Sequence, residues 1–321
     1  SIQHKLGIHG SPTAVLAFGD NGGAIGTLVG EENRGLEYMF IMMNAARFNV
    51  GLEGLGDAER AYQRAVAYAR DRVQGAELGV KGGPKVPIIK HPDVRRMLMS
   101  MRSRIEAMRA LAYVTAAAQD NAHCNPDEAA RQQGQAFADL MIPVVKGWST
   151  ESAIDIASLG VQVHGGMGFI EETGAAQHLR DARITAIYEG TTAIQANDLI
   201  GRKIARESGQ TVKAVIAEMR KVEASLAEAS GEEFAAMRKS LSAGVTALEE
   251  AVAYIVATYG QDIKAASVGS VPFLKLLGIV AGGWQMGRAA LVSARRLAEG
   301  SGDAGFYQAK ITTARFYADH V

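Results

Sequence analysis

The residues best suited to chemistry are a single acid and the small turn that follows it. Glu189 lies between Tyr188 and the turn Gly190-Thr191-Thr192, in the segment "RITAIYEGTTAIQAND". Beside an aromatic ring the carboxylate would be partly desolvated, and desolvation makes a carboxylate a stronger base toward a carbon acid. Gly190 would let a ligand approach the backbone, whose N–H groups could donate to a substrate carbonyl. Spacing alone favours a simpler interpretation, an acid at a helix start with a threonine capping the following turn.

A second candidate is the glycine-rich stretch "QVHGGMG", residues 162–168. Its successive N–H groups could form an anion-binding nest, but the spacing is not that of a dinucleotide-binding fingerprint, and a plain tight turn fits equally well. His164 is typical of a hydrogen-bonded histidine, because no second histidine or carboxylate stands at metal-ligand spacing; no metal is expected. Upstream, "ARDRVQG" ends a helix with Arg72, which either stabilises the helix C-terminus or is available to a phosphate or a flavin edge.

The composition narrows the class of protein. The chain has 321 residues, of which 48% are hydrophobic, enough for a large buried core. Its 34 basic and 34 acidic residues balance, so neither nucleic acid nor an anionic membrane surface is expected as a partner. The single cysteine, Cys124, cannot form an internal disulfide and favours a cytoplasmic location. We expect no run that is long and apolar enough to span a bilayer, and the N-terminus lacks a signal-peptide pattern.

Apolar spacing predicts a mainly α-helical protein with a small β portion at the front. Residues 1–30 carry turn residues around a short apolar piece, typical of one or two strands that belong to a larger sheet. Gly51, Gly54 and Gly56 lie inside the first predicted helix, where each costs about 1 kcal/mol against alanine, so close backbone packing is expected there. Helices are predicted over residues 31–72, 92–124, 127–158, 174–182 and 191–206, with a loop over 73–91 and a helical region from 209 to 321 broken near 230–231, 267–272 and 300–305.

These pieces occur in an order that resembles the acyl-CoA dehydrogenase family. The segments that carry the resemblance are "KLGIHGSPTAVLAF", "LVGEENRGLEYMF", "AYARDRVQG", "HPDVRRML", "GVQVHGGMGF" and "DARITAIYEGTTAIQANDLIGRK". The last form, followed by a further helical segment, resembles the larger subgroup with an added C-terminal domain, which includes 3-methylmercaptopropionyl-CoA dehydrogenase-like enzymes. The resemblance implies the tail of the middle β domain over 1–30, the C-terminal four-helix bundle over 31–206 and an additional helical domain over 207–321. It also implies that the chain is a C-terminal fragment.

The resemblance assigns roles to individual residues. It makes Glu189 the base that removes the α-proton of an acyl-CoA thioester while FAD accepts hydride from the β-carbon, with electrons passing to an electron-transfer flavoprotein. Gly190 corresponds to a substrate contact, as do Asn44 and Arg47 on the side of the CoA moiety. The implied FAD contacts, several of them made across subunits of a homodimer or homotetramer, are Arg72, Gln74, Gln162, Val163, His164, Gly165, Gly166 and Thr191.

Two other functions fit the same pattern. An acyl-CoA oxidase would use the same base and flavin but pass electrons to oxygen. A dehydrogenase-like protein that binds DNA would need a basic extension, and residues 207–321 instead mix acidic residues among the lysines and arginines. The isolated chain is expected to lack part of the wall over the flavin, and so to be inactive by itself.

Overall fold

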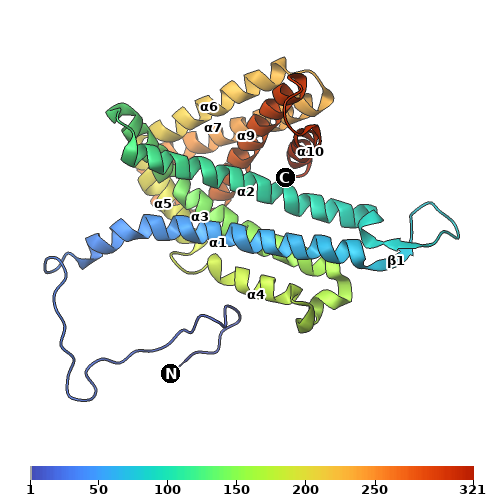
Figure 1. Ribbon diagram of the computed structural model, residues 1–321. Coiled ribbons are helices and arrows are strands. Elements are labelled where there is room, and N and C mark those ends of the chain that lie inside the picture. The colour runs from blue at the N-terminus through green and yellow to red at the C-terminus, as the bar shows by residue number, and fades with distance from the viewer. Residues whose placement is uncertain (1) are drawn as a thin grey trace.

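Three long helices form the body that positions the candidate site. In the computed structural model residues 2–321 are described, apart from the side chains of Phe40 and Ile41. Helices α1 (Gly35–Asp71), α2 (Pro92–Cys124) and α3 (Glu128–His164) lie side by side, and α4 (Ala175–Thr185) packs on α1 and α3 (Figure 1). All three long helices contribute buried residues to one hydrophobic core.

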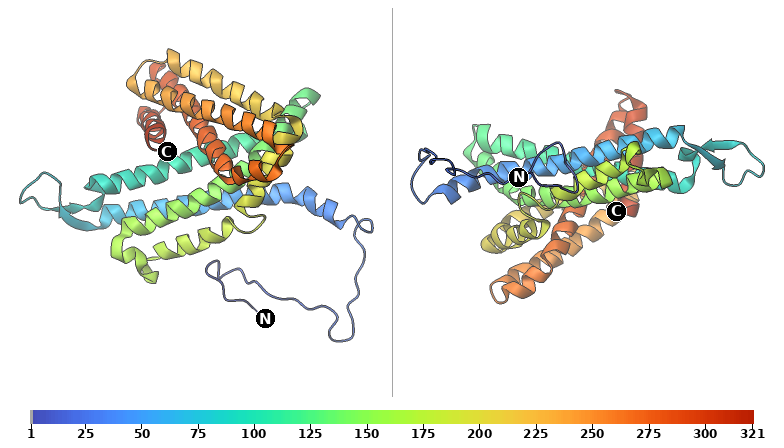
Figure 2. Two further views of the ribbon diagram at one scale, coloured as in Figure 1. Left: turned by 180° about the vertical axis from the view of Figure 1, so that it is seen from behind. Right: turned by 90° about the horizontal axis from the view of Figure 1, so that it is seen from below.

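A second group of helices crosses the first (Figure 2). Helices α9 and α10 contact α2, and α9 also contacts α3, so the same core continues into this group. The elements are α6 (Gln210–Glu228), α7 (Glu232–Tyr259), α8 (Ile263–Val268), α9 (Ser270–Ala298) and α10 (Ala304–His320). The predicted breaks near 230 and 300 are present, and a further break separates α7 from α8.

The connection between the two groups is helical but irregular. Helix α5 (Thr192–Asp198) continues directly into η4 (Leu199–Ile204), a π-helical turn, and then into the 3-10 turn η5 (Ala205–Glu207). The sequence predicted one regular helix over 191–206. The structure keeps the helical path but changes its hydrogen-bond spacing, because the amide of Ala205 donates to the carbonyls of Ile200 and Gly201.

Local sequence signals explain where the long helices begin and end. Helix α2 begins at Pro92 with Asp93 in its first turn. Proline is tolerated there because the first N–H groups of a helix have no partner within the helix, and the carboxylate of Asp93 is stabilised by the positive end of the helix dipole. Asp127 caps α3, its carboxylate accepting from the amide of Ala129 at 3.1 Å. Helix α3 continues past the expected end near residue 158 to His164, where Gly165 with φ +60° terminates it.

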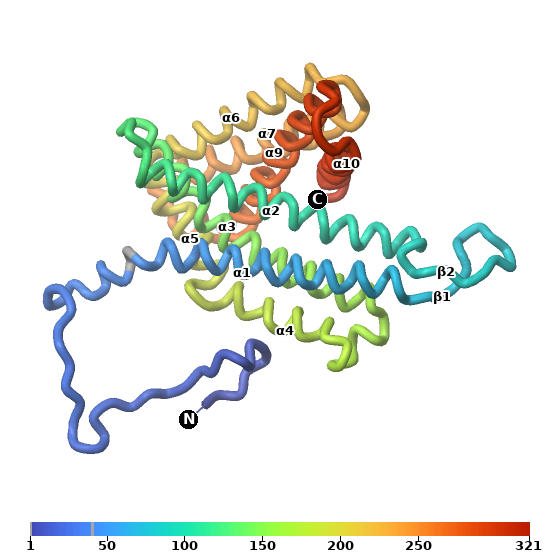
Figure 3. The backbone as a smooth tube through the Cα atoms, in the orientation of Figure 1, coloured from blue at the N-terminus to red at the C-terminus, as the bar shows by residue number. Residues whose placement is uncertain are grey.

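The β structure differs from the prediction. In the described residues, the segment before α1 is largely exposed, with some turns closed by its own backbone hydrogen bonds, and its only strand-like pairing is the isolated bridge between Ile2 and Ala14 (Figure 3). The strand expected around Ala14 is therefore absent, because a strand needs a neighbour to satisfy its backbone. Instead, β1 (Val73–Ala76) and β2 (Lys85–Pro87) form an antiparallel hairpin inside the predicted loop, followed by the 3-10 turn η1 (Ile88–Lys90).

Helix α7 is more apolar than the sequence analysis expected of any segment of the chain. Its 28 residues include a window of mean hydropathy 1.3, which meets the length and composition of a membrane span. The expectation that no run reaches this threshold is wrong for Glu232–Tyr259. In the structure α7 packs against α6, α9 and α10 as part of the C-terminal helical group.

Helices α1 and α3 approach each other closely at Gly51. A Cβ atom placed there would lie 2.8 Å from Cγ1 and 2.9 Å from the carbonyl oxygen of Val145, closer than real Cβ contacts. The expected close packing is therefore present at Gly51. At Gly56 on the same helix a Cβ would meet nothing within 4 Å, so that glycine has no packing reason.

We predict that Gly51→Ala destabilises the fold and Gly56→Ala does not. Overpacking at the α1–α3 contact should lower the free energy of unfolding by about 1–3 kcal/mol. The matched change at Gly56 should raise it by up to about 1 kcal/mol through helix propensity. Urea unfolding followed by circular dichroism measures both, and equal midpoints for the two variants would contradict the packing argument.

Candidate functional site

Glu189 lies in a sharp bend between α4 and α5. Its φ is +54°, a left-handed conformation that few non-glycine residues adopt, and Gly190 follows with φ +89°. The amide of Thr192 donates to the carbonyl of Ala186 at 3.2 Å and closes the bend. Thr191 is the N-cap of α5, its hydroxyl accepting from the amide of Ile194 at 3.4 Å. The bend thus has the helix-start geometry of the simpler interpretation, and it also holds Glu189 in a strained backbone state.

The carbonyl groups of the bend are held from inside the protein. Lys146 of α3 is fully buried, and its Nζ donates to the carbonyl oxygen of Gly190 at 2.7 Å. Gln195 of α5, also fully buried, donates from Nε2 to the carbonyls of Glu189 and Gly190, each at 3.3 Å. The hydroxyl of Thr192 donates to Oε1 of Glu151 at 2.5 Å, a second link to α3. The bend is therefore fixed at several points on α3 and α5.

The amide of Glu189 remains available. Among the described residues no backbone or side-chain group accepts a hydrogen bond from its N–H, and its carboxylate forms no ion pair within 4 Å. The residue is half-buried. A free N–H and an uncommitted carboxylate on one residue are the two groups needed to polarise a carbonyl and to take a proton from the neighbouring carbon.

Burial changes the proton affinity of two groups near the bend. The pKa of Lys146 is lowered to about 8, chiefly by desolvation and also by the nearby Arg47, while Glu151 and Glu189 oppose the shift. Desolvation is also the main cause that raises the pKa of Tyr188, whose hydroxyl donates to Glu53 of α1. Both groups are thereby disfavoured in their charged forms. In the sequence, Lys146 is distinguished only as a lone charge within the apolar run "LMIPVVKGW".

Asn44 and Arg47, the two residues predicted to contact the CoA moiety, differ in their exposure to solvent. Asn44 is exposed on α1. Arg47 is 5% exposed, and its Nη1 lies 3.0 Å from Oδ2 of Asp198, so an internal ion pair is the partner that the structure gives it. Asp198 also pairs with Arg202. A buried pair of this kind is costly to break from one side, which suits a structural link between α1 and the end of α5.

The predicted cofactor residues, apart from Thr191, gather in one place. A cavity of about 380 Å³ at the far end of α1 and α3 is lined by Arg72, Gln74, Gln162, Val163, His164, Gly165 and Gly166, together with Tyr68, Ile88 and Met167. A Cβ atom at Gly165 or Gly166 would meet nothing within 4 Å, so a ligand can approach the backbone there. A guanidinium beside open backbone amides suits a phosphate or the edge of a planar ring.

His164 is part of the wall of this cavity. Its ring stacks on Tyr68 with centroids 4.4 Å apart, and Nδ1 lies 2.7 Å from the carbonyl oxygen of Gly160. Burial is the largest cause that lowers the pKa of His164, so the ring is disfavoured as a cation. The histidine is hydrogen-bonded and packed, as the sequence suggested, at the end of α3.

The cavity and Glu189 are distant from each other. Lys146, which contacts the bend, and Gln162, which lines the cavity, are separated by 16 residues of α3, or about 24 Å at 1.5 Å per residue. The bend and the cavity are therefore two separate places along α3.

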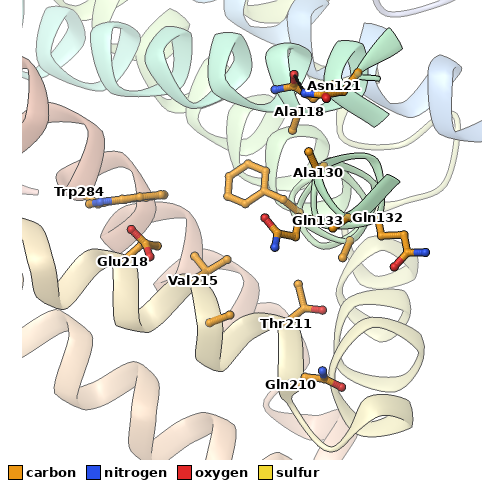
Figure 4. Close-up of a pocket in the computed structure, with 16 residues that line it drawn as sticks. Ala118, Asn121, Ala130, Gln132, Gln133, Gln210, Thr211, Val215, Glu218 and Trp284 are labelled. Atoms are coloured by element: carbon orange, nitrogen blue, oxygen red, sulfur yellow. Dashed lines mark hydrogen bonds between the residues drawn. The ribbon is translucent and has the colours of Figure 1, made fainter. Parts of the chain in front are cut away.

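A larger cavity lies elsewhere. It has a volume of about 770 Å³ between the end of α2, the start of α3, α6 and Trp284 of α9 (Figure 4). None of the residues predicted for the site lines it, and among the described residues of its lining only Glu218 is ionisable. A large volume lined by a single ionisable side chain does not assemble the groups that the proposed chemistry needs, so the bend at Glu189 remains the candidate.

Comparison with known proteins decides the family. Residues 33–204 match the family model described as acyl-CoA dehydrogenase, C-terminal domain, and residues 212–321 match the one described as acetyl-CoA dehydrogenase C-terminal like. The chain belongs to the acyl-CoA dehydrogenase family. Both the bend and the cavity lie within the first of the two matched regions.

Curated relatives of this acyl-CoA dehydrogenase family chain include two bacterial enzymes. The 3-methylmercaptopropionyl-CoA dehydrogenase of Ruegeria pomeroyi is 53% identical over 323 residues, covering 100% of this chain and 54% of the relative. The broad-specificity linear acyl-CoA dehydrogenase FadE5 of Mycobacterium tuberculosis is 37% identical over 331 residues, covering 99% of this chain and 54% of the relative. The chain thus spans about half the length of the curated relatives it matches.

A solved structure supports the fold. The crystal structure of Caenorhabditis elegans ACDH-11 in complex with C11-CoA matches with a TM-score of 0.74 and 21% identity, covering 99% of this chain and 49% of that one. The match extends over both helical groups, so their arrangement is that of a known member of the fold. The mainly α-helical class predicted from the sequence is confirmed.

We predict that the acidic cluster beside Tyr188 destabilises the protein at neutral pH. Burial, with Glu53 and Asp181 nearby, raises the pKa of Asp57 from 3.8 to about 6. Between these values the folded state holds a proton that the unfolded state has lost, so stability falls as the pH rises from about 4 to 6. Asp57→Asn should therefore stabilise the fold at pH 7.5 by about 1–2 kcal/mol, after screening of a partly exposed group.

The measurement is urea unfolding at pH 7.5 and at pH 4.0. The gain from Asp57→Asn should be present at the higher pH and largely absent at the lower. Asp120→Asn, an exposed change on α2, is the control and should alter stability by less than about 0.5 kcal/mol at either pH. An equal gain at both pH values would show that ionisation of the buried Asp57 carboxyl is not the cause.

Proposed function

We propose that this chain carries the catalytic base of an FAD-dependent acyl-CoA dehydrogenase, which converts an acyl-CoA thioester to the trans-2-enoyl-CoA. The observation that carries the proposal is Glu189, held in a left-handed bend with an uncommitted carboxylate and a free amide. The family membership supports it, as do the two curated relatives, which are named as dehydrogenases of CoA thioesters.

The chain's own groups account for the proton half of the reaction. The thioester carbonyl accepts from the N–H of Glu189, which makes the α C–H more acidic. The carboxylate then takes the α-proton and becomes neutral. FAD, when bound, supplies the acceptor for the hydride that leaves the β-carbon, so that the two electrons removed from the substrate leave with that hydride as the α,β double bond forms.

The cavity residues fit the cofactor that the proposal needs. Arg72 and the open backbone at Gly165 and Gly166 would hold phosphate or ring-edge oxygens, while Gln74 and Gln162 offer amide hydrogen bonds. Val163 and His164 would shape the wall, and Thr191 would contact the flavin from the side of the bend. Because of the distance along α3, the cavity would serve the flavin of a second subunit in a homodimer or homotetramer.

Further features of the proposal follow from the family. The substrate is an acyl-CoA, contacted at Gly190 and, on the side of the CoA moiety, by Asn44 near the buried Arg47. Electrons would pass from the flavin to an electron-transfer flavoprotein, and the protein would work in the cytoplasm. The domain division at 31–206 and 207–321 stays a prediction.

We predict that Glu189→Gln abolishes oxidation of acyl-CoA. In a flavin-loaded enzyme that contains this chain, the variant should bleach the flavin band on addition of acyl-CoA at least 1,000-fold more slowly, because the amide cannot take a proton. Exchange of the α-proton with D2O, followed by mass spectrometry, should be lost in parallel. Acyl-CoA binding should remain within about threefold, since the amide is nearly the same size.

The control is Glu172→Gln, an exposed acid in the turn before α4, which should bleach at the unaltered rate. Bleaching by Glu189→Gln within tenfold of the unaltered enzyme would contradict the proposal. Peroxide formation without an electron-transfer flavoprotein would assign the same site to an oxidase.

A further inference from the structure

Lys146 is a buried lysine that the reaction outlined above does not use. It lies at the middle of α3 with no exposed surface, among residues 140–150 that are all buried. Long cationic side chains are rarely buried without a partner, because removing an ammonium group from water is costly. The lowered pKa of Lys146, about 8, is the mark of that cost.

The partner that Lys146 has is the backbone of the bend. Nζ donates to the carbonyl oxygen of Gly190 at 2.7 Å, in the peptide group that joins Gly190 to Thr191, one residue beyond Glu189. The bond needs only an N–H, and both the ammonium and the neutral amine supply one. It therefore holds the bend in either protonation state of the lysine.

The bend would not keep its shape by local preference alone. A left-handed φ at a glutamate costs about 1 kcal/mol or more, and persists only where the surroundings determine it. Gln195 shares the carbonyl of Gly190 and adds that of Glu189, but at 3.3 Å its bonds are longer than that of Lys146. The shortest hydrogen bond to the carbonyls of Glu189 and Gly190 is thus the one from Lys146.

The helix that carries Lys146 is itself firmly placed. The neighbouring Val145 is in contact with Gly51 of α1, and the hydroxyl of Thr150 donates to the carbonyl of Lys146 at 2.8 Å. One turn further, Glu151 accepts from Thr192 on the other side of the bend. Lys146 therefore links the bend to the most closely packed part of the bundle.

We propose that Lys146 is a positioning residue for Glu189: by holding the carbonyl of Gly190 it fixes the direction of both the carboxylate and the amide of Glu189. This inference rests on the proposed function of Glu189 as the base. The charged groups that face Lys146 are Glu151, Glu189 and Arg47. A donor that holds the carbonyl of Gly190, whether the amine is neutral or charged, gives a reason for a lysine in this apolar interior.

Lys146→Met tests the inference, because methionine fills a similar volume without a donor. In the flavin-loaded enzyme that contains this chain, kcat should fall 10- to 100-fold while the KM for acyl-CoA changes less than threefold. Lys146→Arg, which keeps N–H donors, should recover at least part of the loss. Lys275→Met, an exposed change on α9, is the matched control and should leave both constants unaltered.

A second measurement uses the chain alone and needs no turnover. Amide hydrogen exchange over residues 186–192 should be at least tenfold faster in Lys146→Met than in the unaltered chain or Lys275→Met, with core amides of α2 unchanged. If Lys146→Met kept the unaltered kcat and exchange rates while Glu189→Gln lost activity, the positioning role would be overturned and the base would stand. If Glu189→Gln kept its activity, the proposed function would fail, and the exchange result would still decide whether Lys146 holds the bend. If Lys146→Met does not fold, Lys146→Arg decides the question. Unaltered kcat and exchange rates in Lys146→Arg would support the inference. A kcat at least tenfold lower together with exchange at least tenfold faster would overturn it, because the N–H donors are still present.

Discussion

The candidate site depends on the close contact between α1 and α3. Where Gly51 admits Val145, the two helices approach too closely for a side chain on α1. The next residue of α3 is Lys146, whose side chain reaches the bend. Since protein interiors are packed as densely as organic crystals, a shift of α3 at this contact would move the lysine with it. The position of Glu189 is in this sense set by a glycine on another helix.

The bend brings together groups from distant parts of the chain. The hydroxyl of Tyr188 donates a hydrogen bond to Glu53 of α1. The carbonyl of Gly190 accepts hydrogen bonds from Lys146 of α3 and from Gln195 of α5. The cavity lined by Arg72 and His164 is assembled in the same way, from the end of α1, the hairpin and the end of α3. Each of the two places therefore requires α1 and α3 together, and the contacts named come from residues before the C-terminal helical group.

Much of the fold was predictable because the signals are local. Pro92 with Asp93 marked the start of α2, and Asn125 with Pro126 marked its end. The hairpin at 73–76 and 85–87 was missed because glycine and proline indicate turns, whereas strand pairing depends on residues ten or so apart. The end of α3 was missed because Leu159-Gly160 resembles a break, while packing carries the helix on to Gly165.

The site was predictable in part. Glu189 and the glycine-rich stretch stood out by residue type, and their assigned roles came from the resemblance to a family. Arg47 was assigned to the substrate, yet the structure pairs it with Asp198, 151 residues away, a contact that no local pattern indicates. Lys146 carried only the weak signal of a charge among apolar residues, since its partner is a backbone carbonyl.

The π-helical turn η4 has a consequence for the protein's architecture. Each residue of an α-helix turns the chain by about 100°, so a wider turn changes the angular phase of everything that follows it. The turn at Leu199–Ile204 follows Asp198, whose side chain pairs with the buried Arg47, and it precedes η5 and α6. The direction in which the C-terminal helices leave the bundle therefore depends on the winding of these six residues, together with the left-handed Ser208 and Gly209 (φ +54° and +76°) that follow before α6.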